Sequence, residues 1–205
     1  MSAAAPEAPL GAVLAGGAGS RLGGAKATAQ LSGRPLISYP LAAFAAAGIE
    51  AVVVAKAETE LPPPGGWGGA APRVLIEPDE PRHPLAGIIA ALREAGQRPL
   101  IVLACDMPFA EPALLSALAS APEPLVVPAP GGLPQPLQAR YSASLLPALE
   151  AALADQEPLR KTVAALSPRL LGESELTRFG PPERLFLNVN DAVDLKLAEA
   201  LLESS

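Results

Sequence analysis

Five residues near the amino terminus, three glycines and two cations, are suited to binding an anion. Gly16, Gly17 and Gly19 follow a short apolar run, and Arg21 and Lys26 follow the glycines. Glycine lets the backbone approach a ligand without a Cβ atom in the way, and the free N–H groups of such a loop suit phosphate oxygens. The two cations add attraction for the same anion. The segment therefore predicts a polyphosphate-binding loop, with a plain glycine-rich turn as the ordinary alternative.

Two well-known phosphate-binding loops do not match this segment. A P-loop closes with Gly-Lys-Ser/Thr, and no such triplet follows the glycines. A dinucleotide-binding fingerprint needs a helix that begins at the glycines and an acidic residue about 20 positions further on. Position 46 and its neighbours are alanines. If the loop binds phosphate, it therefore belongs to neither of these two classes.

Asp106 is the strongest candidate for a metal ligand. It follows the apolar run Pro99–Ala104, which is typical of a buried parallel strand. Ligands of open α/β sheets bind at the carboxyl ends of the strands, so Asp106 and the glycine loop should meet at one edge. A carboxylate beside a polyphosphate calls for a cation, and Mg²⁺ bridges the two. The alternative is an aspartate that merely turns the chain before Met107 and Pro108.

The elements that must position these residues alternate between strand and helix. This rhythm predicts a three-layer α/β sandwich with a mostly parallel, Rossmann-like sheet and a short antiparallel addition in the second half. We expect one domain over residues 1–205. The expected strands are 10–14, 50–55, 73–76, 99–104, 124–127, 135–141 and 185–187, and the expected helices are 35–47, 85–95, 112–119, 144–154, 159–166 and 191–203, with Asp191 as the cap of the last helix.

Composition excludes several classes of function. A net charge of −6 and an aromatic content of 3% argue against a general nucleic-acid or anionic-membrane surface. The single cysteine, Cys105, rules out an intrachain disulfide and a multi-cysteine zinc site, and it is expected to be a small buried residue. The single histidine, His83, is expected in a solvated loop. No stretch is apolar enough to span a bilayer, so a cytoplasmic protein is expected.

Three segments together resemble the nucleotidyltransferases that act on the molybdenum cofactor. They are the loop from Leu14 and Ala15 to Lys26, the phrase Cys105 to Phe109 and the segment Asn188 to Asp191. The paired glycines point to the guanylyltransferase branch. The resemblance spans about residues 9 to 200 and implies the fold of nucleotide-diphospho-sugar transferases. It implies catalytic roles for Arg21 and Lys26 and a Mg²⁺-binding role for Asp106. The nucleotide-binding residues that it implies are Leu14, Ala15, Gly16, Gly17, Gly19, Lys26, Asp79 and Asp106.

The second half carries the residues that the resemblance assigns to the acceptor. Asn188 and Asn190 are expected on one side of a strand end, where turn and capping chemistry is the plain alternative. Gln135 opens a segment similar to the strand that lines the acceptor pocket in that family. Arg160 and Lys161 form a basic pair, which faces the acceptor's phosphate in the family and is otherwise simply solvated.

The reaction that the resemblance implies transfers GMP from GTP to the phosphate of molybdopterin and releases pyrophosphate. Residues from about 9 to 110 would hold the nucleotide, and residues from about 130 to 200 the acceptor. Molybdopterin-loading proteins and molybdoenzyme chaperones are candidate protein partners. Two alternatives stay open: a cytidylyltransferase or another nucleotidyltransferase acting on molybdopterin or a sugar phosphate, and a carrier that binds nucleotide or pterin without turnover. The chain departs from the family's pattern at Ala25, at Ala55-Lys56 and at His83.

Overall fold

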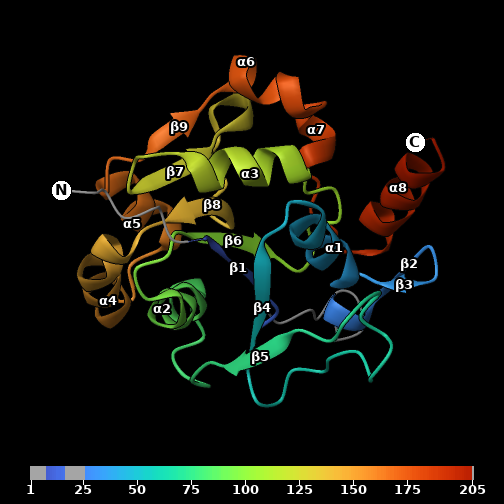
Figure 1. The fold of residues 1–205 in the computed structure, drawn as a ribbon, viewed down its shortest axis with the longest axis horizontal. Coiled ribbons are helices and arrows are strands. Elements are labelled where there is room, and N and C mark those ends of the chain that lie inside the picture. Colours follow the sequence, from blue (N-terminus) through green and yellow to red (C-terminus); the bar gives the residue numbers. More distant parts are fainter. Residues whose placement is uncertain (1–7, 17–25, 205) are drawn as a thin grey trace.

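A seven-stranded sheet forms the centre of the protein in a computed structural model, which describes residues 8–16 and 26–204. The sheet has the order β5-β4-β1-β6-β8-β7-β9, and β2 pairs with β3 in a separate hairpin (Figure 1). The strands are β1 (Leu10–Leu14), β2 (Gln30–Leu31), β3 (Arg34–Pro35), β4 (Glu50–Ala55), β5 (Arg73–Ile76), β6 (Leu100–Ala104), β7 (Leu125–Pro128), β8 (Gln138–Tyr141) and β9 (Arg169–Leu171).

Helices cover both faces of this sheet, which confirms the predicted three layers (Figure 1). The α-helices are α1 (Ser38–Ala46), α2 (Pro84–Ala95), α3 (Pro112–Ser120), α4 (Leu146–Ala154), α5 (Leu159–Ala165), α6 (Glu173–Leu176), α7 (Pro182–Leu185) and α8 (Ala192–Glu203). Short 3₁₀ turns are η2 (Lys26–Thr28), η3 (Pro130–Gly132), η4 (Ala143–Leu145) and η5 (Thr177–Phe179). None of the helices within 8–16 and 26–204 has the length and apolar character needed to cross a membrane.

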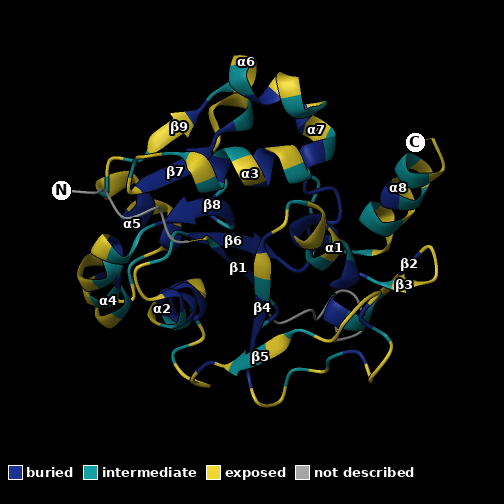
Figure 2. Cartoon of the chain, in the orientation of Figure 1, coloured by how far each residue is buried: buried dark blue, intermediate teal, exposed yellow. Residues whose placement is uncertain are grey.

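Strand β6 shows why the core forms in two layers. All five of its residues are buried, as the continuous apolar run predicts (Figure 2). Ile101 and Leu103 pack into one cluster with residues of α1 and α3, whereas Leu100 and Val102 pack into the other with residues of α2, α4 and α5. Because side chains alternate along a strand, one short segment anchors both helix layers.

The parallel part of the sheet brings four strand ends to one edge. β1 pairs in parallel with β4 and with β6, and β4 pairs in parallel with β5. The register aligns Leu14 with Val54 on one side and with Ala104 on the other. The segments that leave β5, β4, β1 and β6 therefore lie next to one another in that order.

The predicted antiparallel addition is β8, which lies between β6 and β7. It runs antiparallel to both neighbours, and β9 then pairs in parallel with β7. The strand expected at 124–127 is β7, and its neighbours are β8 and β9. Which strands become neighbours depends on long-range packing, which the local alternation of strands and helices does not encode.

Two local predictions were wrong. The first helix does not begin at Pro35, which belongs to the β2–β3 hairpin turned by Gly33 at φ 75°; it begins three residues later, at Ser38. The strand expected at 185–187 does not form, because Pro182 starts the short helix α7 and an irregular segment follows. A short apolar run does not by itself distinguish a strand from a helix.

A third, smaller core holds the carboxyl-terminal segment in place. Val189 is fully buried together with Leu31, Leu36, Phe109 and Ala198. This cluster joins α8 to the β2–β3 hairpin and to the segment after β6. The backbone N–H of Val189 also donates to the carbonyl of Asp106 at 2.9 Å. The asparagines on either side of Val189 are thereby tied to the end of the central strand.

Candidate functional site

A cavity of about 530 Å³ lies at the carboxyl edge of the parallel strands. Residues from the ends of β1, β4, β5 and β6 line it, together with the start of α2 and the segment before α8. This is the place where the topology of an open α/β sheet puts a ligand. The lining residues are Leu14, Gly16, Lys26, Lys56, Glu77, Arg82, His83, Pro84, Gly87, Ala104, Cys105, Asp106, Leu137, Asn188 and Asn190.

Lys26, Asp106 and Asn190 meet on one wall of this cavity. The ammonium of Lys26 donates to Oδ2 of Asp106 at 2.6 Å and to Oδ1 of Asn190 at 2.8 Å. The side chains of Lys26 and Asp106 are only 17% and 13% exposed, so their attraction is screened less than that of a surface pair. The structure thus brings together three residues that the sequence assigned to the loop, the metal and the acceptor.

One carboxylate oxygen of Asp106 is available to a ligand. Its Oδ1 is buried and, within the part of the chain that the structure describes, accepts no hydrogen bond. An unpaired buried carboxylate oxygen is costly unless a ligand completes it. The described residues contain no cluster of three or more histidine, cysteine, aspartate or glutamate side chains, so a cage made by the protein alone is absent from them. One carboxylate with phosphates and water is the kind of donor set that Mg²⁺ uses, and Asp106 fits it.

The two asparagines reach the cavity from an irregular segment rather than from a strand. The N–H of Asn190 donates to Oδ2 of Asp194 at 2.8 Å, and Asp191 caps α8 by accepting from Val193 and Asp194, as predicted. The amide of Asn188 donates to the carbonyl of Phe186 at 3.3 Å. Both asparagines line the cavity, and the side-chain oxygen of Asn190 accepts from Lys26.

An ion pair that was not predicted from the sequence also lines the cavity. Lys56 follows β4 and Glu77 follows β5, and their side chains are 5% and 7% exposed. Nζ of Lys56 lies 3.7 Å from Oε1 of Glu77. The reasoning that selected Asp106, a polar residue directly after an apolar strand, would also have selected these two.

Two glycines make room for the carboxylate of Glu77. A Cβ atom at Gly16 would lie 2.1 Å from Oε1, and one at Gly87 would lie 3.0 Å from Oε2. The first distance is far inside van der Waals contact. Gly16 is therefore needed for the close approach of a buried acid, in addition to the role expected for it in phosphate binding.

Burial changes the acidity of two groups at the cavity. It raises the pKa of Glu77 above its ordinary value, and the nearby ammonium of Lys56 offsets only part of that rise. Burial also raises the pKa of the Cys105 thiol to about 12, with a contribution from the charge of Asp106. Cys105 therefore stays protonated at neutral pH, which agrees with its expected role as a small buried residue rather than a nucleophile.

The structure places the other predicted site residues as follows. Leu14 and Gly16 line the cavity, and buried Ala15 donates its N–H to the carbonyl of Val54 at 2.8 Å. Gly17, Gly19 and Arg21 lie outside the described residues. Four predicted residues do not line this cavity. Asp79 is exposed, and its carbonyl accepts a hydrogen bond from Lys56, whereas Gln135 lies at a separate surface hollow. Arg160 and Lys161 are exposed on α5, and Lys161 pairs with Glu157 at 2.7 Å. Their expected contacts with substrate stay predictions.

His83 is not the solvated loop residue that was expected. Its Nδ1 accepts a hydrogen bond from the N–H of Leu85 at 3.2 Å, so the imidazole caps α2. The side chain is partly buried and lines the cavity. A histidine cap is unusual because serine, threonine, aspartate and asparagine are preferred there, and nothing in the local sequence indicates it.

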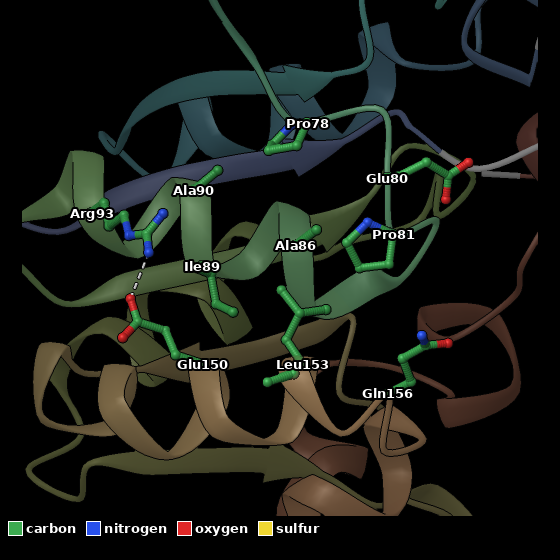
Figure 3. Close-up of a pocket in the computed structure, with 11 residues that line it drawn as sticks. Pro78, Glu80, Pro81, Ala86, Ile89, Ala90, Arg93, Glu150, Leu153 and Gln156 are labelled. Carbon is green, nitrogen blue, oxygen red and sulfur yellow. Dashed lines mark hydrogen bonds and ion pairs between the residues drawn. The ribbon is translucent and has the colours of Figure 1, made fainter.

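A second cavity, of about 490 Å³, lies between α2, α4 and the segment around Pro81 (Figure 3). Ile89, Ala86 and Leu153 give it an apolar floor, and the ion pair of Arg93 with Glu150, at 2.7 Å, stands at one end. Arg93 is the only cationic side chain among the described residues that line it, and Glu150 already pairs with it. The chemistry expected from the sequence therefore belongs to the first cavity.

Known proteins match both the sequence and the fold. Residues 11–170 match the family model described as MobA-like NTP transferase domain. A molybdenum cofactor guanylyltransferase of Cereibacter sphaeroides is 33% identical over 202 residues, which cover 94% of this chain and 96% of that protein. One of Pseudomonas putida is 33% identical over 187 residues, 84% of this chain and 93% of that protein.

The solved structure of molybdopterin-guanine dinucleotide biosynthesis protein A from Archaeoglobus fulgidus superimposes with a TM-score of 0.79 at 27% identity, over 96% of this chain and all of that one. A 2-C-methyl-D-erythritol 4-phosphate cytidylyltransferase of Thermus thermophilus shares the fold, with a TM-score of 0.66 at 23% identity over 96% of this chain and 99% of that one. With its family model matched over most of its length, this chain belongs to the MobA-like NTP transferases.

Proposed function

We propose that this protein is a Mg²⁺-dependent guanylyltransferase that transfers GMP from GTP to the phosphate of molybdopterin. The observation that carries the proposal is the convergence of Lys26, Asp106 and Asn190 in one cavity at the end of β6. The names of the relatives supply the acceptor and the base. In the reaction an oxygen of the acceptor's phosphate bonds to the α-phosphorus of GTP, the bond from that phosphorus to the bridging oxygen breaks, and pyrophosphate leaves.

This chemistry needs no general base. The attacking phosphate oxygen is already ionised at neutral pH, so no proton has to be removed. The protein's task is to align two anions and to neutralise the charge that accumulates on the phosphates. Lys26 is placed for this, because its ammonium is held at the wall of the cavity by Asp106 and Asn190. Arg21 would add a second cation from the glycine loop.

Asp106 would hold the Mg²⁺ ion, with Asn190 beside it. Support comes from Oδ1 of Asp106, which is buried and accepts no hydrogen bond from the described residues. When bound, the ion would neutralise phosphate charge and orient the triphosphate. Lys26 already occupies the other carboxylate oxygen, so carboxylate and ammonium would both face the phosphates.

The two halves of the chain would divide the substrates. Leu14, Gly16, Lys56 and Glu77 come from the first half and line the side of β1, β4 and β5, where the nucleotide would bind. Leu137 and the asparagines come from the second half and line the cavity too, with Asn190 beside Lys26, and the acceptor would bind against them. Asp106 stands between them at the end of β6, which suits a residue that acts on the reacting phosphate.

A screen for pyrophosphate release tests this proposal. The protein is incubated with each of the four nucleoside triphosphates and Mg²⁺, with and without molybdopterin. Release only with GTP and molybdopterin together is the expected result. Release with CTP instead would identify a cytidylyltransferase, and release with a sugar phosphate would identify another acceptor. Tight binding of nucleotide or pterin by calorimetry, without release under any condition, would identify a carrier and contradict the enzyme.

A further inference from the structure

One segment of the chain, residues 78–83, forms part of the lining of both cavities. Its last two residues line the first cavity, whereas Pro78, Glu80 and Pro81 line the second (Figure 3). Helix α2 begins directly after the segment and also contributes side chains to both cavities. We call residues 78–83 the shared wall, because a ligand on one side of it touches backbone that also bounds the other side.

The shared wall holds a charged residue of the first cavity in place. The buried ammonium of Lys56 donates to the carbonyl of Pro78 at 2.6 Å and to that of Asp79 at 3.1 Å. At the other end of the wall, Nδ1 of His83 accepts from the N–H of Leu85 at 3.2 Å and so caps α2. The position of Lys56 in the first cavity therefore depends on the backbone of the wall.

The second cavity has the size and the lining of a small-molecule site. Its volume is about 490 Å³, and ligand pockets typically measure about 300–1,000 Å³ and are mostly apolar with a few polar groups. Ala86 and Ala90 of α2 and Ala154 of α4 are small side chains, while Ile89 and Leu153 supply larger apolar surface (Figure 3). Small residues on both helices leave room for an apolar body between them.

The polar groups of the second cavity favour a cation. The guanidinium of Arg93 is paired with Glu150 at 2.7 Å, at one end of the cavity. Glu80 and Gln156 lie at the opposite end (Figure 3), and the side chain of Glu80 is 78% exposed. Helix α4 also ends there, and the carbonyl groups of a last helical turn carry partial negative charge. Two carboxylates against one guanidinium leave the described lining with an excess of negative charge.

We propose that the second cavity binds a small amphipathic cation, an ammonium group on an aromatic or aliphatic body, and that its occupancy is transmitted to the first cavity through the shared wall. The apolar body lies between α2 and α4, and the ammonium lies towards Glu80. The ligand orders the wall that it touches at Pro78 and Pro81. A nucleotide that then binds beside Lys56 has less backbone left to order, so its affinity rises. The coupling rests on the proposed function, whereas the cation site does not.

Titration with 2-phenylethylammonium, followed by backbone ¹H–¹⁵N NMR, tests the site. We expect a Kd of about 1 mM, reasonable for so small a ligand, with shifts in the shared wall, α2 and α4. 3-Phenylpropionate, which has the same ring and the opposite charge, should bind at least about fivefold more weakly. Ala154→Leu fills the cavity from an exposed position on α4 and should abolish binding. Ala151→Leu is the matched control, because it is exposed on the same helix outside the lining.

Calorimetry with GTP and Mg²⁺ tests the coupling. At a saturating concentration of 2-phenylethylammonium the parent should bind GTP about threefold more tightly than without it. By thermodynamic reciprocity, GTP should raise the affinity for the cation by the same factor. Both effects should be lost in Ala154→Leu and kept in Ala151→Leu.

Several results would overturn the inference. Equal binding of the cation and the carboxylate, no shifts around the second cavity, or parent-like binding in Ala154→Leu would remove the site, and circular dichroism verifies the fold of the variant. A GTP affinity that ignores the bound cation would remove the coupling. Failure of the proposed function looks different: the parent binds the cation with the expected shifts but binds CTP more tightly than GTP, or no nucleotide. The backbone amide of Lys56 then decides, since a shift on cation binding supports transmission through the wall and an unmoved signal contradicts it.

Discussion

Lys26 and Asp106 are 80 positions apart in the chain, yet their side chains form an ion pair of 2.6 Å. Lys26 stands at the end of the glycine loop, and Asp106 stands at the end of the central strand. Asn190, from the carboxyl-terminal segment, contacts the same ammonium at 2.8 Å. The contact joins a predicted phosphate ligand to a predicted metal ligand and so defines the centre of the site.

Replacement of Lys26 should impair catalysis without unfolding the protein. Lys26→Ala removes a charge-assisted contact to phosphate, and we expect turnover to fall about 10²-fold or more, from a loss of about 3 kcal/mol. Pyrophosphate release measures the effect. Lys196→Ala is the matched control, because Lys196 is exposed on α8. Near-normal release by Lys26→Ala would remove Lys26 from the site.

Neutralisation of Asp106 should weaken the use of metal. Asp106→Asn keeps the shape of the side chain and removes its charge, so activity should collapse and the remainder should need more Mg²⁺. A Mg²⁺ titration of pyrophosphate release shows the shift. Asp155→Asn, at the exposed end of α4, should leave the titration unchanged. An unaltered Mg²⁺ requirement in Asp106→Asn would mean that the ligand lies elsewhere.

A single methyl group at Gly16 should disturb the nucleotide end of the cavity. In Gly16→Ala the new Cβ would lie 2.1 Å from Oε1 of Glu77, so the buried carboxylate must move. Overpacking of this kind costs about 1–3 kcal/mol, and GTP affinity should fall by tenfold or more. Gly69→Ala is the control, because its Cβ would meet no atom within 4 Å. Parent-like GTP affinity in Gly16→Ala would show that the carboxylate has no fixed role.

The raised pKa of Glu77 makes a prediction about stability and pH. A carboxyl group whose pKa is raised on folding contributes stability that is fully present below its unfolded pKa and is lost as the pH rises through its folded pKa. Ionisation of Glu77 therefore costs stability as the pH rises through this raised pKa. Glu77→Gln should melt at the same or a higher temperature than the parent at neutral pH, and the difference should shrink as the pH falls towards the ordinary range of a glutamate.

Thermal melts at several pH values check this prediction. Glu60→Gln is the control, because Glu60 is exposed at the surface. A lower melting temperature for Glu77→Gln at neutral pH would mean that the pair with Lys56 contributes more than burial costs.

Asn188 tests the division of the cavity between the two substrates. Its amide donates to the carbonyl of Phe186, and Lys26 contacts Asn190 rather than Asn188. Asn188→Ala should weaken binding of molybdopterin by about five- to tenfold, the worth of one hydrogen bond, and leave GTP affinity nearly intact. Calorimetry with each substrate separates the two effects. Lost GTP affinity with normal pterin affinity would reverse the assignment of the halves.

The double variant Arg160→Ala with Lys161→Ala tests how far the acceptor site extends. Both residues lie on α5, exposed, and outside the cavity lining. The prediction that they contact the acceptor's phosphate requires a loss of pterin affinity with unchanged GTP affinity, about 1.5–3 kcal/mol for each direct contact. Unchanged pterin affinity would confine the acceptor to the cavity itself.

Several elements could be predicted from the sequence because their signals are local. β4 and β5 begin and end at the predicted residues, and α2 and β6 do so within one residue. Asp191 caps α8 as expected. Buried strands are continuous apolar runs and helices begin at prolines or capping residues, so a short window of sequence carries the information.

Asp106 and Lys26 were also accessible from the sequence. Each stands at a position where an α/β sheet must present its ligands: the end of the central strand and the loop after the first one. Lys56 and Glu77 stand at equivalent positions after β4 and β5 but were overlooked. An isolated charge after a strand is usually solvated, and only packing reveals that this pair is buried.

The sequence by itself determined the fold class, the glycine loop and the family, because apolar periodicity and short motifs are formed by residues close together in the chain. Tertiary structure decided that β8 lies between β6 and β7, that α7 replaces a predicted strand, and that Asn190 reaches Lys26. It alone paired Glu77 with Lys56 beside Gly16. These outcomes depend on contacts between residues far apart in the chain, whose energies come from shared burial and charge, and no local pattern encodes them.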